Sequence, residues 1–139
     1  MGIFGAIDIA GSGMHVARTW LDAVSDNIAN INTVHRTSES AFQQRFVIAQ
    51  SVDYGNGSSA EGTGGGVAVA GVAFGSAEGR LRSDPTSPLA DANGMVRAPD
   101  VDLGDQMSQL MIAQRAYQAN IAVVERAQAA YQAALGIWK

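Results

Sequence analysis

The amino-acid sequence predicts a mainly α protein with a small β element. A long helix is expected at each end of the chain, with a glycine-rich β-hairpin insertion between them. Apolar residues recur at alternating spacings of four and three near both ends, while glycines and turn pairs gather in the middle. Because each run covers at least three heptads, we expect the two helices to pair as a coiled-coil-like hairpin. Two ordinary amphipathic helices on a small core are the alternative.

The C-terminal run begins after Pro99. Residues that return every 3.5 positions keep one stripe of a helix facing a partner helix. Asp100 or Asp102 is available as the N-cap, and Asp105 lies near the positive end of the helix dipole. The expected seam consists of Leu103, Met107, Leu110, Gln114, Tyr117, Ile121, Val124, Gln128, Tyr131, Leu135 and Trp138.

The N-terminal run, from Ile3 to about Ile31, is the expected partner. Gly11 and Gly13 weaken this helix, since each interior glycine costs about 1 kcal/mol relative to alanine. These glycines either allow another backbone to approach closely or mark a break before the main helix. The expected stripe consists of Ile3, Ile7, Ala10, Met14, Ala17, Leu21, Val24, Ile28 and Ile31.

Length and turn signals divide the chain into three parts. The 139 residues are expected to form an N-terminal helix over 1–33, a small glycine-rich β and loop domain over 34–99, and a C-terminal helix over 100–139. Nine glycines lie between Gly55 and Gly79. This composition indicates tight turns and loops.

Within the middle part, Phe42 to Val52 is rich in aromatic and β-branched residues and is expected to be a strand. Val67 to Phe74 is expected to be a second strand, which needs a bulge near Ala70-Gly71 if it is a single one, and Glu78 to Arg82 is its expected hairpin partner. Asp84-Pro85 and Asn93-Gly94 are turn signals, and Met95-Val96 is a short strand after the second turn.

The outer face of the C-terminal helix is poor in charge. Alanine and glutamine dominate its positions outside the seam, and its only charged residues between Gly104 and Trp138 are Asp105, Arg115, Glu125 and Arg126. Neighbours on several sides explain such a surface better than one partner and solvent. Gln114 and Gln128 occupy equivalent seam positions, where buried polar residues fix register; seam positions that face solvent are the alternative.

Composition excludes several classes of partner. A net charge of −4 without a basic stripe disfavours nucleic acid. The absence of cysteine excludes disulfides and thiolate metal sites. The N-terminus lacks the features of a cleaved signal peptide, and no apolar run is long enough to span a bilayer.

The sequence carries no recognisable catalytic motif. Gly62 to Gly66 is not followed by Lys-Ser/Thr, and His15 and His35 lack partners at catalytic spacing. Asp91-x-Asn93 matches part of a calcium loop, but the first and last ligand positions do not fit, so a turn is expected there. We therefore expect no enzyme activity, no cofactor and no metal.

Several segments resemble the bacterial flagellar basal-body rod proteins of the FlgC family. They include Ser12-Gly13-Met14, Asp84-Pro85 with Pro88, Asp91 to Val96, and Pro99 to Asp102. Two further motifs of the resemblance contain Asp26, Asn27, Ile28, Ala29, Asn30, Asn32 and Thr33, and Arg115, Ala116, Tyr117, Ala119 and Asn120. The first of them marks the wider family of flagellar rod and hook proteins, and the segment from Asp84-Pro85 to Asn93-Gly94 points to the FlgC member. Two departures stand out: Asp26 where the family more often has asparagine, and a loosely matching segment Val34 to Arg45.

The resemblance implies a subunit of the proximal rod of the flagellum. It would be exported without a cleaved signal through the flagellar type III apparatus and assembled in the periplasm. Its terminal helices would form an inner tube domain around the export channel, packed against other copies and against FlgB, FlgF, FlgG and FliE. Such neighbours account for the outer face poor in charge.

Two classes of function are therefore compared. The first is a structural rod subunit that transmits torque. The alternative is a self-contained helical hairpin that binds a partner helix or a membrane surface, or another flagellar axial protein. The outer face lacks the Lys and Arg residues of a membrane-surface helix and the mixed charges of a soluble hairpin, which favours the first class.

Overall fold

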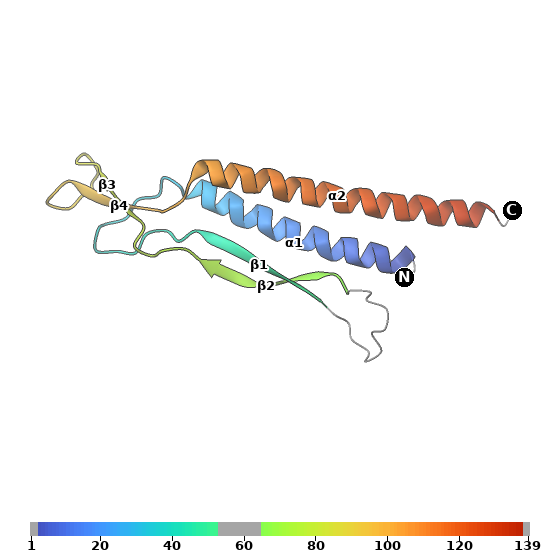
Figure 1. Cartoon of the computed structure of the whole chain (residues 1–139). Coiled ribbons are helices and arrows are strands. Elements are labelled where there is room, and N and C mark those ends of the chain that lie inside the picture. Colours follow the sequence, from blue (N-terminus) through green and yellow to red (C-terminus); the bar gives the residue numbers. More distant parts are fainter. Residues whose placement is uncertain (1–2, 53–64, 138–139) are drawn as a thin grey trace. The chain divides into compact units, whose positions relative to one another are not determined.

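The computed structural model describes residues 3–52 and 65–137, the side chain of Ile3 excepted. Its elements are α1 (Ile3–Ala29), β1 (Arg45–Ser51), β2 (Val67–Phe74), β3 (Arg80–Ser83), β4 (Met95–Ala98) and α2 (Leu103–Gly136), shown in Figure 1. The predicted fold class is confirmed: two long helices pair, and two small strand pairs accompany them. The seam position Trp138 and the glycines Gly62 and Gly64 lie outside the described residues.

The chain forms two compact units. Unit 1 comprises Met1–Leu21, Ile48–Gly71 and Ile112–Lys139, and unit 2 comprises Asp22–Val47 and Val72–Met111. In each unit a stretch of α1 lies beside a stretch of α2, and part of the β1–β2 pair belongs to the same unit (Figure 1).

In unit 1 the two helices come close at Gly13. A Cβ added at Gly13 would lie 2.7 to 2.9 Å from side-chain atoms of Asn120, whose Nδ2 donates to the Ala116 carbonyl at 2.9 Å. Near the N-terminal end of α1, the rings of Phe4 and Tyr131 meet edge to face at 5.8 Å. Gly13 therefore permits a close approach of α2, one of the two roles expected for it.

Ser12 connects the start of β2 to α1 within unit 1. Its hydroxyl donates to the Ile9 carbonyl at 2.7 Å and accepts from the Val67 amide at 3.1 Å. Gly66, just before the strand, has φ of +102°, and a Cβ there would lie 2.4 Å from Ser12 Oγ. Only glycine fits this backbone and this contact.

In unit 2 the strands β3 and β4 pair antiparallel, from Arg80 opposite Ala98 to Ser83 opposite Met95. The predicted pairing of residues 78–82 with residues 67–74 is wrong, because β2 pairs with β1 instead. The loop between β3 and β4 explains the difference. Its ends are joined by a hydrogen bond from the Asp84 amide to the Gly94 carbonyl, and Gly94 has φ of +72°.

Asp91 organises that loop. Its Oδ1 accepts hydrogen bonds from the amides of Met95 at 3.0 Å and Asn93 at 2.8 Å, and its own amide donates to the Met95 carbonyl. The amide of Met95, followed by that of Asn93, holds the pKa of the Asp91 carboxyl below its ordinary value. The turn expected at Asn93-Gly94 is thus built around a carboxylate that bonds its own loop.

The core of unit 2 lies where the strand pair meets the ends of the helices. Val24, Val96, Pro99 and Val101 are among its fully buried side chains. Next to this core, Arg97 Nη2 donates a hydrogen bond to the Thr37 carbonyl at 2.6 Å. Residues 95–101 therefore lead the chain into α2 through a packed segment.

The two glycines of α1 give a matched test of the close approach at Gly13. Gly11→Ala is expected to raise the free energy of unfolding by about 0.5 to 1 kcal/mol, since no atom of residues 3–52 and 65–137 lies within 4 Å of its added Cβ. Gly13→Ala is expected to lose this gain, because the methyl group displaces the Asn120 amide. Urea denaturation followed by circular dichroism measures both values. Equal stabilisation by the two substitutions would contradict the contact.

Asp91 gives a pH test. Its pKa is lower in the folded chain than its ordinary value of 3.8, so its stabilising contribution is complete above that pH and is lost as the pH falls through the folded pKa. Asp91→Asn is expected to remove this acid-dependent part of stability. The difference in unfolding free energy between the two chains should shrink below pH 3.8. A difference that stays constant with pH would show that the loop does not stabilise the carboxylate.

Candidate assembly site

The buried side chain of Asn27 joins α1 to α2 and to β1 within unit 2. Its Nδ2 donates to Gln106 Oε1 at 2.9 Å and to the Arg45 carbonyl at 3.0 Å. Its Oδ1 accepts from the Arg45 amide at 2.8 Å. Asn27 is 0% exposed, so these bonds replace the water that its amide group has lost. This asparagine of the first motif is a connector of three elements.

Gln106 is the functional residue that sequence reasoning missed. It is 0% exposed and lies one position before Met107, which was expected in the seam. Its Nε2 is buried without a hydrogen-bond partner in the described part of the chain. The sequence holds one signal for it: Asn27 lies beside the apolar stripe of α1, and a buried asparagine needs hydrogen-bond partners, one of which the facing helix can supply.

The two departures from the family pattern meet at one contact. Arg45 Nη1 lies 3.1 Å from Asp26 Oδ2, although among the described residues no hydrogen bond of acceptable geometry reaches this oxygen. Asp26 Oδ1 accepts from Asn30 Nδ2 at 3.2 Å. Both charged side chains are partly exposed, so the ion pair contributes at most about 1 kcal/mol. The acidic residue at the end of α1 thus has a basic partner in β1.

The other motif residues after Asn27 close the end of α1. Asn30 Nδ2 donates to the Asp26 carbonyl at 2.9 Å, and Thr33 Oγ1 donates to Asn30 Oδ1 at 3.2 Å. Ala29 and Asn32 are exposed. The Asp26 carbonyl also accepts from the Asn30 amide at 3.1 Å, so these side-chain bonds add to the backbone bonds at the end of a helix that runs into a turn.

In the single chain α2 presents to α1 a stripe that is rotated from the predicted seam. Its buried or half-buried positions at alternating spacings of four and three are Gln106, Leu110, Ala113, Tyr117, Asn120, Val124 and Ala127. Three of these belong to the predicted seam. At the other four positions of the stripe, the inward residue is smaller or more polar than the predicted seam residue and precedes it by one position. Small side chains such as Ala113, 0% exposed, let the helices approach closely.

The remaining seam positions of α2 lie mostly outside this stripe. Ile121 is half-buried, and the exposed ones are Leu103, Met107, Gln114, Gln128, Tyr131 and Leu135. The described N-terminal stripe, by contrast, is at least half-buried throughout: Ile7, Ala10, Met14, Ala17, Leu21, Val24 and Ile28 on α1, and Ile31 in the turn after it. The chain itself thus covers the stripe of α1 and leaves much of that of α2 open.

The second motif straddles both sides of α2. Arg115 and Ala119 are exposed, Ala116 and Tyr117 are half-buried, and Asn120 lies against Gly13. Part of this motif therefore contacts α1, and part lies on the exposed surface of α2.

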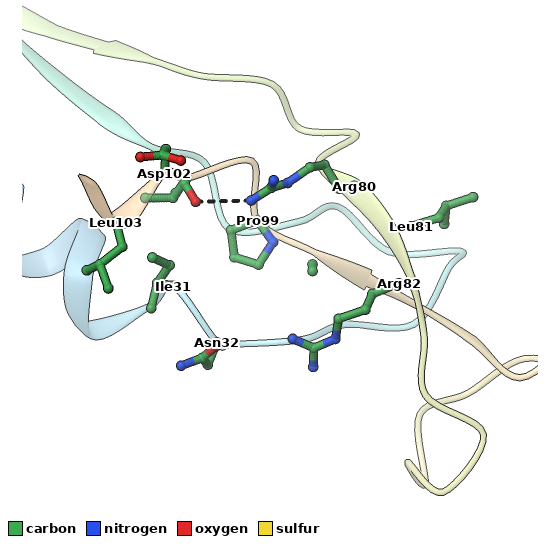
Figure 2. Close-up of a pocket in the computed structure, with 10 residues that line it drawn as sticks. Ile31, Asn32, Arg80, Leu81, Arg82, Pro99, Asp102 and Leu103 are labelled. Atoms are coloured by element: carbon green, nitrogen blue, oxygen red, sulfur yellow. Dashed lines mark hydrogen bonds between the residues drawn. The ribbon is translucent and has the colours of Figure 1, made fainter. Parts of the chain in front are cut away.

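A pocket of about 460 Å³ lies in unit 2 (Figure 2). Ile31, Pro99 and Leu103 line it, and Arg80 and Arg82 flank it. Arg80 is engaged within the chain, because its Nη2 donates to the Val101 carbonyl at 3.0 Å and its Nε lies 3.2 Å from Asp100 Oδ1. The pocket marks the junction between the end of α1 and the start of α2.

Neither membrane-spanning nor metal-binding features are found in residues 3–52 and 65–137. No helix there is both long and apolar enough to cross a bilayer. No three His, Asp or Glu side chains there are grouped so that they could hold a metal ion.

Comparison with known proteins agrees with the two motifs. A family model described as "Flagella basal body rod protein" matches residues 7–34. A second, described as "Flagellar basal body rod FlgEFG protein C-terminal", matches residues 92–137. The two matches cover Asn27 and Gln106, the two side chains that connect the helices in unit 2.

Similar proteins cover most of the chain. The flagellar basal-body rod protein FlgC of Salmonella typhimurium is 37% identical over 124 residues, which is 89% of each chain. FlgC of Borreliella burgdorferi is 32% identical over 149 residues, covering 99% of this chain and 98% of the relative. FlgC of Bacillus subtilis is 27% identical over the whole of both chains. The chain therefore belongs to the FlgC family of flagellar basal-body rod proteins.

Proposed function

We propose that the chain is a structural subunit of the proximal rod of the bacterial flagellar basal body, where it helps to transmit torque and to enclose the export channel. The relatives are basal-body rod proteins by name. The observation that supports an assembling subunit is the apolar surface that α2 leaves uncovered.

That surface consists of large side chains along the whole helix. Those at least 42% exposed are Leu103, Met107, Met111, Ile112, Val123, Tyr131, Leu135 and Ile137. Full burial of such a side chain stabilises by about 1.5 to 3 kcal/mol, so covering several of them favours association strongly. Only four charged side chains lie between Gly104 and Trp138, which leaves little charge to desolvate.

The exposed seam positions are the ones we assign to neighbouring subunits. Leu103, Met107 and Leu135 keep a heptad spacing on α2 and are exposed, whereas Tyr131, at the same spacing, meets Phe4 of α1 edge to face. In this proposal α2 carries one stripe for its own α1 and a second for helices of adjacent subunits. The partners are other copies and the rod proteins FlgB, FlgF, FlgG and FliE.

The proposal also covers location and domain roles. Residues 1–33 and 100–139 belong to the inner tube domain, and residues 34–99 form the small glycine-rich β and loop domain. The subunit reaches the periplasmic rod through the flagellar type III apparatus without a cleaved signal peptide. Its work is mechanical, and it catalyses no reaction.

A deletion strain tests this role. We expect basal bodies from such a strain to stop before a rod forms, and swimming to be lost, because the shaft lacks one of its subunits. Electron microscopy of cell envelopes and motility plates measure both. Rods and hooks that persist without the chain would favour the alternative of a self-contained helical binding module.

A single charge on the outer face tests the contact surface. Ala119→Glu is expected to change the stability of the isolated chain by no more than about 0.5 kcal/mol, since Ala119 is exposed. It is expected to abolish motility, because the new carboxylate would be buried between subunits. Ser40→Glu, at an exposed position outside the helices, is the control and should leave swimming intact. Normal swimming with Ala119→Glu would show that this face does not contact neighbouring subunits.

A further inference from the structure

We propose that the amide pair Asn27–Gln106, together with the seating of Asn120 on Gly13, fixes the register in which α2 pairs with α1. Gln106 acts as a positioning residue whose contribution is selectivity of pairing and not stability. The inference builds on the proposed function, because a rod subunit has to present its outer stripe at one fixed position. It concerns a property of the chain alone.

The two contacts have one common register. Gly13 and Asn27 are two heptads apart on α1, and Gln106 and Asn120 are two heptads apart on α2. Asn27 contacts Gln106 within unit 2, and Gly13 contacts Asn120 within unit 1. In an antiparallel pair, equal separations on both helices mean that both contacts form together or not at all.

The apolar pattern by itself does not exclude other registers. Stripes that repeat every heptad keep apolar contacts when one helix slips by seven residues. A slip in one direction would place Asn27 level with Ala113 and Asn120 level with Trp20. The fully buried Asn27 would then lose its partner on α2, and Asn120 would meet a large side chain in place of a glycine.

The strand β1 makes the amide of Asn27 directional. The amide and carbonyl of Arg45 both bond to the Asn27 side chain, which fixes its orientation. The remaining Nδ2 hydrogen then points toward α2, where Gln106 Oε1 accepts it at 2.9 Å. Only a residue with an acceptor at this level of α2 completes the arrangement.

The buried amide of Gln106 is expected to affect the register of the helix pair more than the stability of the chain. Its Nε2 is a buried donor without a hydrogen-bond partner in the part of the chain that the structure describes, and such a group is unfavourable. Gln106→Met keeps the length of the side chain and removes this donor together with the bond to Asn27. The two effects oppose each other, so the melting temperature should change little or rise while the register is relaxed.

Distances between spin labels test the register. The chain has no cysteine, so Arg18→Cys and Ala130→Cys provide two label sites, both exposed and both in unit 1. Pulsed electron paramagnetic resonance should give one narrow distance in the otherwise unaltered chain. Gln106→Met should add a second population, shifted by up to roughly 10 Å for a slip of seven residues. Gln114→Met, at an exposed glutamine of the same helix, should keep the single distance.

Each other result would overturn the proposal. A single unchanged distance in Gln106→Met would show that Gln106 does not set the register. A second population in the Gln114→Met control would show that the effect is unspecific, and a broad distribution in the unaltered chain would show that the register is not fixed. A marked loss of thermal stability in Gln106→Met would assign Gln106 to ordinary packing. None of these results depends on rods, so they are independent of the deletion test.

Discussion

The hydrogen-bonded amide of Asn27 is the interaction on which the rest of unit 2 depends. It is the point where the last turns of α1, the first turn of α2 and the start of β1 share one side chain. A buried amide restricts where its hydrogen-bond partners can lie, because each bond that is not made costs the free energy of removing that polar group from water. The Asn27 side chain thereby holds α1, α2 and β1 in one defined arrangement at this point.

Much of the architecture could be predicted from the sequence. The helices and all four strands follow from apolar periodicity and turn residues, because these are local signals. The pairing of β3 with β4 could not be predicted, because it depends on the loop that Asp91 organises from within. Close approach at Gly13 was one of two roles expected from the sequence, and its partner Asn120 lies more than a hundred residues away in the chain.

The stripe of α2 that faces α1 was harder to predict. Periodicity favoured the large apolar residues Met107 and Ile121, whereas Gln106 and Asn120, one position earlier in each case, contact α1. Heptad counting ranks side chains by hydrophobicity, but closely spaced helices select small ones and hydrogen-bonded ones. In a chain proposed to have several neighbours, the largest apolar residues need not face the partner in the same chain.

The exposed apolar side chains of α2 have a thermal consequence. In the proposed rod, neighbouring subunits cover Leu103, Met107 and Leu135. Near 25 °C the free energy gained by burying these side chains is mainly the entropy of the water released, and the burial lowers the heat capacity. Such a driving force fades on cooling and is weakened little by salt, unlike contacts between charges. A shaft held together in this way would tolerate wide changes in ionic strength and be most easily loosened by cold.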